Sequence, residues 1–441
     1  MHVQTNSAIS IPPLTTGARG AGWSVALVAL ASFWLLAGPR LELITIASSS
    51  VRFEDLILVA LAVYCIAGWS SGARKRHVKR GALVVALIGL ACAVIGFAMG
   101  RTDLISGVLY ALRPLEYWVV FPALVIALGR DFPAGVAVMI RVLAAVSVVQ
   151  VGVALLQIAG LTIGFSKFSY ERGAGLTAGP YELGAICAML TCFWLARRSY
   201  ALALVCVVGV LVSQSRVSLV AVVVGVLLLM ILDRKGEFRL PRRPPRPVAV
   251  VAATLLAVTA IVLIPVALPT VVAPSVSRVD DSQLLSAWNE AARASGAIGS
   301  LATASQYSVV AYDAIGVNVT SQTASSDASN VVRFYRWQLL LKEFLQSPGT
   351  VAFGLGPSFA GPSVDGALLR VLLETGAVGF VAWVVWFRRT LRGAMPWFVA
   401  ATATLIVGSL FIDLLFALRP MVLFWMLAAM SRKEDGRIRD A

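Results

Sequence analysis

Residues 81–100 read GALVVALIGLACAVIGFAMG, a run of twenty positions without a charged side chain. A helix of this length rises about 30 Å, which matches the hydrocarbon core of a bilayer. The run therefore predicts a membrane-spanning helix. The whole chain agrees with it, because 59% of its 441 residues are hydrophobic, only 13% are charged, and its mean hydropathy is +0.85. Since soluble domains carry about 25% charged residues, this composition excludes a soluble globular enzyme, a disordered chain and a fibrous protein.

Further apolar segments of helical length repeat the pattern along the chain. Together they predict an all-α fold, a polytopic transmembrane bundle of about 12 helices. The segments are 22–38, 54–69, 81–100, 105–128, 134–158, 181–196, 199–213, 217–232, 248–271, 365–387, 394–413 and 417–430. The first has no convincing cleavage site and many more segments follow it, so we expect a retained helix rather than a signal peptide.

The net charge of +15 indicates membrane topology rather than nucleic-acid binding. When the N-terminus is placed inside and the helices alternate, most of the 37 lysines and arginines fall on the cytoplasmic side. Both termini are then cytoplasmic. This placement predicts three regions: nine helices in 1–271, one large outer loop at 272–364, and three helices with a cytoplasmic tail in 365–441.

The two halves of the outer loop differ in composition. The first half is rich in Ser, Ala and Thr, and we expect it to be loosely structured. The second half contains Asn330–Gln346 (NVVRFYRWQLLLKEFLQ), which predicts a helix stopped by Pro348. Arg333 and Trp337 are four positions apart and therefore share one face of that helix.

Four of the arginines on the predicted outer side, which run against the general charge bias, stand out as candidate site residues. They are Arg172 in YERGAGLTAGPYELG, Arg216 in VSQSRVSLV, Arg333 in RFYRW, and Arg419 in FIDLLFALRP. One interpretation makes them solvated topological charges or lipid-headgroup anchors, with Asp413 as a partner for Arg419. The other makes them ligands of an anion. An arginine between short apolar helices, as at position 216, favours a functional role.

Phosphate or pyrophosphate at the lipid surface is the anion that such arginines suit best. Guanidinium stays charged and donates two parallel hydrogen bonds, which fits phosphate oxygens. The glycine-rich stretch at 175–179 would add free backbone N–H groups at a helix start. The only histidines, His2 and His77, are predicted to be cytoplasmic, so outer-face chemistry must proceed without imidazole. No metal-ligand spacing is present, and the five cysteines lie inside apolar segments as small core residues.

Three blocks in the second half of the chain carry a family resemblance. The first runs from Arg172-Gly173 through Gly179-Pro180 to Leu183-Gly184, the second is Ser215-Arg216, and the third combines Arg333-x-x-x-Trp337, Gly354-Leu-Gly356 and Leu368–Gly379 (LLRVLLETGAVG). In this order and spacing, they resemble the superfamily of O-antigen ligases and Wzy-type O-antigen polymerases. The resemblance covers roughly 170–387.

The resemblance implies a metal-independent, inverting glycosyltransferase of the bacterial inner membrane, without a cofactor. Its donor would be an undecaprenyl-pyrophosphate-linked oligosaccharide. Its other partners would be membrane lipid and chain-length regulator and flippase proteins, but not nucleic acid. By motif, Arg216 and Arg333 would be catalytic and would bind the pyrophosphate. The assigned substrate-binding residues are Arg172, Arg336, Trp337 and Arg419.

The chain departs from the ligase pattern at one place. Ligases carry a His-Asn pair before the L-x-x-L-x-E-x-G helix, and here that pair falls on Asp365 and Gly366. Asp365 is either a catalytic general base or only the N-cap of the following helix. Without the histidine the chain resembles a polymerase more than a ligase. A ligase remains the first alternative. A flippase or transporter is the second, although it would predict inverted repeats that the sequence does not show.

Overall fold

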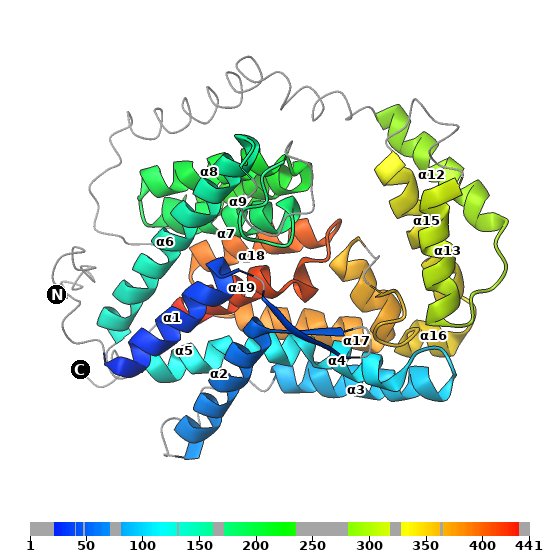
Figure 1. The fold of residues 1–441 in the computed structure, drawn as a ribbon, viewed down its shortest axis with the longest axis horizontal. Helices are drawn as coiled ribbons and strands as arrows, with labels where there is room; N and C mark the ends of the chain where they lie inside the picture. Colours follow the sequence, from blue (N-terminus) through cyan, green and yellow to red (C-terminus); the bar gives the residue numbers. More distant parts are fainter. Residues whose placement is uncertain are drawn as a thin grey trace, which may run out of the picture.

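The computed structural model describes residues 22–39, 41–46, 49–70, 81–129, 132–161, 172–234, 281–317, 328–361 and 365–431, and these are mostly helical (Figure 1). The first part contains α1 (Trp23–Ala37), β1 (Glu42–Ile46), β2 (Ser49–Arg52), α2 (Phe53–Ser70), α3 (Gly81–Ala98), α4 (Leu104–Trp118), α5 (Val120–Leu128) and α6 (Phe132–Ile158). The middle contains α7 (Pro180–Ala196), α8 (Tyr200–Ser213), α9 (Arg216–Arg234), α12 (Asp281–Gly296), α13 (Ala304–Val317), α15 (Ala328–Phe344) and α16 (Pro348–Phe353). The last part contains α17 (Ala367–Leu391), α18 (Pro396–Ser409), the short 3-10 helix η3 (Leu414–Phe416) and α19 (Leu418–Met430).

The predicted apolar segments coincide with helices wherever the structure describes them, and segment 248–271 lies outside the described residues. Among the residues that the structure describes, four helices are long and apolar enough to cross a membrane: Gly81–Ala98, Leu104–Leu128, Phe132–Ile158 and Ala367–Leu391. Six shorter apolar helices accompany them, including α1, α7 and α19. The chain therefore has the composition and helix lengths of a membrane protein, and the number of twelve spans stays a prediction.

The expected all-α fold is interrupted by one short hairpin between α1 and α2. Strands β1 and β2 pair antiparallel, with Glu42 opposite Arg52 and Ile46 opposite Ser49. The segment Glu42–Ile46 reads ELITI, whose alternating apolar and β-branched residues favour an extended chain. Its five residues are too few for hydropathy over a helical window to reveal them.

The core is built on the helices that are apolar all around. Every residue of α19 from Leu418 to Met430 is buried, and α7 is buried over nearly its whole length. Such helices belong in the centre of a bundle. Trp386 of α17 stacks on Trp425 of α19 with ring centroids 5.1 Å apart. Peripheral helices instead expose large side chains, such as Leu30 on α1 and Ile66 on α2, as lipid-facing surfaces do.

Helices α12, α13, α15 and α16 stand together at one side of the bundle, at the right of Figure 1. They share a second, separate core that includes Tyr307, Leu339, Leu340 and Phe359. The predicted helix of this loop is confirmed as α15. Pro348 does follow its end, and it also starts α16. The expectation of a loosely structured first half is wrong where it is described, because α12 and α13 pack their apolar faces on α15.

Helix α17 is broken at Gly376, whose φ of 68° and ψ of −173° are not helical. The break releases two carbonyls of the helix, and the turn after α16 binds them. The backbone N–H groups of Leu355 and Gly356 donate to the carbonyls of Leu373 and Glu374 at 2.8 and 3.1 Å. A Cβ on Gly376 would collide with the backbone of α16. The glycine spacing noted in the sequence therefore reflects a close approach of two backbones.

The predicted topology can be tested with two single-cysteine variants, one before α17 in the sequence and one at the C-terminal end of α17. Gly299 is exposed and has open space around a Cβ, and Arg392 is exposed at the C-cap of α17. We expect an impermeant thiol reagent added outside the cell to label Gly299→Cys and not Arg392→Cys. The five native cysteines are buried, which keeps the background low. Labelling of both variants, or of Arg392→Cys alone, contradicts the predicted topology.

Candidate functional site

Long-range hydrogen bonds tie together helix ends that the alternation places on the outer side. The Nη2 of Arg419, at the start of α19, donates to the carbonyl of Gly38 after α1 at 2.5 Å. The N–H of Ala367, at the start of α17, donates to the carbonyl of Ile412 after α18 at 3.2 Å. Arg419 thus joins the start of α19 to the end of α1, and the start of α17 is joined to the segment after α18.

Most backbone N–H groups of the glycine-rich stretch before α7 are hydrogen-bonded within the protein. The amide oxygen of Gln157 on α6 accepts from the N–H groups of Ala174 and Gly175 at 2.8 and 2.9 Å. The amide oxygen of Gln150, about two turns earlier on the same helix, accepts from the N–H of Leu176 at 2.8 Å. The expected anion-binding role of these N–H groups is therefore wrong, because buried glutamines already occupy them.

Arg172 and Arg216 lie at the same corner of the bundle. The guanidinium of Arg172 donates to the carbonyls of Ser213 and Gln214, each at 3.3 Å, at the tip between α8 and α9. It also donates to the hydroxyl of Tyr181 at 3.3 Å, and its central carbon lies 4.8 Å from the ring centroid. Arg216 is the partly exposed first residue of α9, two positions beyond Gln214. Two of the predicted anion ligands are thus close neighbours in the fold.

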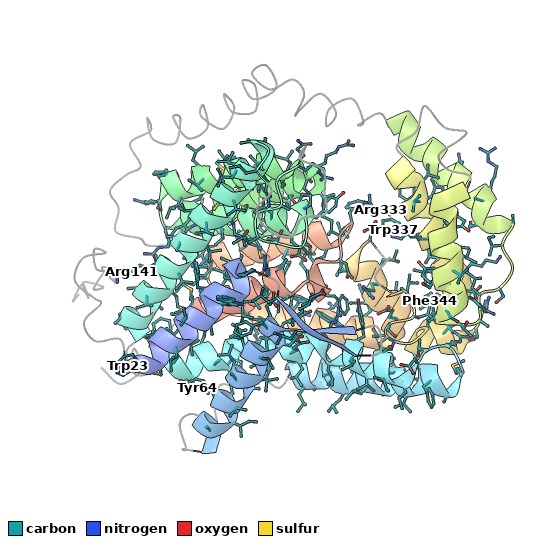
Figure 2. The ribbon with its side chains drawn as sticks, in the orientation of Figure 1. Trp23, Tyr64, Arg141, Arg333, Trp337 and Phe344 are labelled. Carbon is teal, nitrogen blue, oxygen red and sulfur yellow. The ribbon has the colours of Figure 1, made fainter. Side chains whose placement is uncertain are left out.

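Arg333 and Trp337 lie on α15 (Figure 2), and both contact residue 365. The Nε of Arg333 lies 3.2 Å from Oδ2 of Asp365, and the side chains are 15% and 46% exposed. The indole Nε1 of Trp337 donates to the backbone carbonyl of Asp365 at 2.6 Å. The carboxylate is therefore held beside a guanidinium and remains open to a ligand.

Asp365 does not cap α17. The N-cap residue is Gly366, which has no side chain that could cap the helix, and the helix begins at Ala367. The capping alternative is therefore wrong, since the carboxylate of Asp365 is directed to Arg333 instead. Its role as a base stays a prediction.

Two of the predicted substrate-binding arginines, Arg336 and Arg419, connect parts of the fold through hydrogen bonds to backbone carbonyls. The Nε of Arg336 donates to the carbonyl of Ala311 at 3.3 Å, so this side chain ties α15 to α13. Arg419 is fully buried and binds the end of α1 through Gly38. Neither a solvated charge nor a headgroup anchor describes Arg419, because no part of it reaches the surface.

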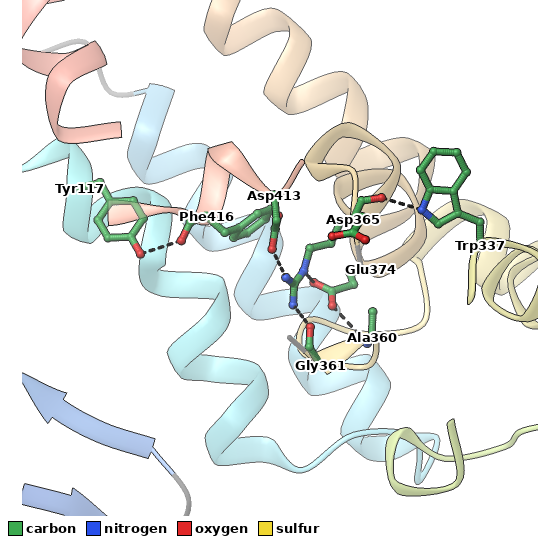
Figure 3. A network of polar contacts seen from close by, with 9 residues as sticks. Tyr117, Trp337, Ala360, Gly361, Asp365, Glu374, Asp413 and Phe416 are labelled. Carbon is green, nitrogen blue, oxygen red and sulfur yellow. Dashed lines mark hydrogen bonds and ion pairs between the residues drawn. The ribbon is translucent and has the colours of Figure 1, made fainter. Parts of the chain in front are cut away.

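The structure adds a buried charged network next to Asp365 that the sequence reasoning missed (Figure 3). Arg370, on the first turn of α17, is fully buried and pairs with Asp413 and with Glu374, the latter at 3.2 Å. Its Nη2 donates to the carbonyl of Gly361 at 2.6 Å. Glu374 in turn accepts from the N–H of Ala360 at 3.3 Å. The network joins α17, the turn before it, and the segment before η3.

Aromatic rings enclose the guanidinium of Arg370. Its central carbon lies 4.2 Å from the ring centroid of Tyr110 on α4 and 5.1 Å from that of Phe416. A cavity of about 20 Å³ beside Glu374 lies between α3, α4 and α17, which is room for about one water molecule. It is too small for a sugar.

The sequence did contain a signal for this network. Arg370 and Glu374 are four positions apart within an otherwise apolar segment, LLRVLLE, which is the spacing of an ion pair on a helix. Asp413 was considered only as a partner of Arg419, and it is paired with Arg370. Its true partner lies 43 residues away, and no local pattern connects them.

Within the described residues, no group of three or more His, Cys, Asp or Glu side chains is placed to hold a metal ion. Comparison with protein-family models matched none of them to this chain. Comparison with curated proteins found no match either.

Proposed function

We propose that this protein is a glycosyltransferase of the bacterial inner membrane that polymerises lipid-linked saccharide repeat units at the outer face. The pair of Arg333 and Asp365 is the observation that carries the proposal. It combines a phosphate-binding cation with a half-exposed carboxylate at the start of a candidate membrane-spanning helix. A lipid-anchored donor would reach such a position from the bilayer. The resemblance of the sequence blocks to O-antigen polymerases and ligases adds the substrate class.

In the proposed reaction, an acceptor hydroxyl attacks the anomeric carbon of the donor sugar. The bond between that carbon and the pyrophosphate oxygen breaks, and undecaprenyl pyrophosphate leaves with the electron pair. Asp365 takes the proton of the hydroxyl, a task that needs a positioned base within hydrogen-bond reach. Arg333, joined by Arg216, stabilises the charge that develops on the leaving group. Arg172 supports this corner by holding the tip from which Arg216 extends.

Purified protein supplied with lipid-linked repeat units tests the proposal. A ladder of products, each longer by one repeat, is expected from a polymerase. A single transfer to a lipid A core or protein acceptor would indicate the ligase alternative, which uses the same chemistry. Movement of lipid-linked saccharide across vesicles without any new glycosidic bond would indicate a flippase or transporter.

The arginines should not tolerate lysine. Lysine keeps the positive charge but cannot donate two parallel hydrogen bonds to one phosphate. We expect Arg216→Lys and Arg333→Lys each to lower the rate of polymerisation by about tenfold or more. Arg388→Lys is the control, since Arg388 is exposed near the opposite end of α17 and should keep the full rate. Full activity in both test variants would reduce these arginines to topological charges and contradict their convergence on one pyrophosphate.

A further inference from the structure

A row of four aromatic rings passes the Arg333–Asp365 pair. It starts at Trp288 on α12, continues through Phe334 and Trp337 on α15, and ends at Phe411 just after α18. Successive ring centroids are 5.4, 5.7 and 6.4 Å apart. The row therefore leads from α12 through α15 to the segment after α18 as one continuous set of ring contacts.

The rings at both ends of the row are exposed, which distinguishes them from core aromatics. Trp288 is 39% and Phe411 41% exposed, whereas Tyr307 and Phe359 in the neighbouring core are almost completely buried. The row thus presents flat apolar faces to the outside. Exposed aromatic surface that lines a polar site is typical of ligand binding.

Trp337, one of the two inner rings of the row, is fixed in place. Trp337 donates its indole N–H to the backbone of Asp365 at 2.6 Å and stacks on Phe411 at an interplanar angle of 27°. A ring held in this way loses little conformational freedom when a ligand binds, which favours affinity. The same hydrogen bond holds the ring against the backbone of Asp365.

The chemistry of the row fits a saccharide better than a lipid chain. Pyranose rings present apolar C–H faces, which pack on aromatic faces, and a rim of hydroxyls, which bond to charged groups at the edge. Arg333 and Asp365 supply such an edge, with side chains 15% and 46% exposed. An acyl chain in the same place would strip water from the carboxylate without replacing its hydrogen bonds, which is costly.

We propose that Trp288, Phe334, Trp337 and Phe411 form a saccharide-binding track that guides the sugar chain of the substrate past Asp365. This inference rests on the proposed function and extends it, because it assigns the sugar rather than the pyrophosphate to a surface. The track runs away from the bundle onto α12. It therefore binds repeat units beyond the reacting sugar.

Saturation-transfer NMR tests the track on the full-length protein in lipid nanodiscs. The probe is the free oligosaccharide released by mild acid from the lipid-linked saccharides of the source cells. Irradiation of aromatic protons should transfer magnetisation to the C–H protons of the sugar. We expect Trp288→Ala and Phe411→Ala each to weaken binding by about tenfold, which is the size of one lost ring contact. Trp288→Phe should keep most of the affinity.

Phe353→Ala is the matched control, because Phe353 on α16 is 42% exposed and lies off the row. It should bind the oligosaccharide as the unaltered protein does. Equal affinity in all variants, or no transfer to the sugar in the unaltered protein, overturns the track. Binding that depends on the row in a protein without transferase activity would support the track and contradict the proposed function. Normal polymerisation together with unchanged oligosaccharide binding in Trp288→Ala and Phe411→Ala would support the proposed function and contradict the track.

Discussion

Asp365→Asn is expected to reduce the polymerisation rate by about 10²–10⁴-fold, the usual contribution of a general base. Asparagine keeps the size and polarity of the side chain and removes the proton acceptor. The fold should be unaffected, because Asp365 does not cap α17 and its ion pair with Arg333 is partly exposed. Such pairs contribute only about 0–1 kcal/mol to stability. The measurement is the initial rate with lipid-linked repeats, at equal amounts of membrane-inserted protein.

Asp103→Asn provides the control for this substitution. Asp103 caps α4 by accepting from the N–H of Ser106 at 2.9 Å, and asparagine caps about as well as aspartate. We expect this variant to match the unaltered protein in both rate and stability. A near-normal rate in Asp365→Asn would leave the site without a carboxylate base at this position. Proton removal would then have to be assigned to the pyrophosphate of the donor.

The largest loss of stability is expected from Arg370→Ala. The substitution leaves the buried Glu374 and the partly buried Asp413 without their common cation. Removing one partner of a buried ion pair costs about 3–5 kcal/mol. It also breaks the contact with the carbonyl of Gly361, which fixes the turn before Asp365. Thermal unfolding in detergent should show the loss, and Arg370→Lys should recover only part of it because an ammonium group cannot span three acceptors.

A combined variant separates the buried charge from lost packing. Arg370→Met together with Glu374→Gln and Asp413→Asn removes the cation and both carboxylates. It should therefore be clearly more stable than Arg370→Met alone, since neutralising a whole buried network costs far less than breaking it. Equal stability of the two variants would mean that the network does not hold this end of α17. Arg388→Ala, at an exposed site on the same helix, should change stability little.

The sequence could predict the helices because the signals for them are local. A run such as 81–100 has the length and hydropathy of a span whatever surrounds it, and α3 forms there. The helical period likewise placed Arg333 and Trp337 on one face of α15, from which both contact residue 365. The glycine pattern around Gly354 and Gly376 was visible as well, although its cause was not.

Only the tertiary structure decided which polar groups meet. Arg419 and its acceptor Gly38 are separated by 381 residues, and Arg370 and Asp413 by 43. Gln157 occupies backbone N–H groups of the glycine-rich stretch that the sequence offered to an anion. By sequence, Asp365 could be a cap or a general base, and the structure excludes the cap because its carboxylate pairs with Arg333 on α15. The physical reason is that hydropathy and period act within one helix, whereas a hydrogen-bond partner is set by how helices distant in the chain pack together.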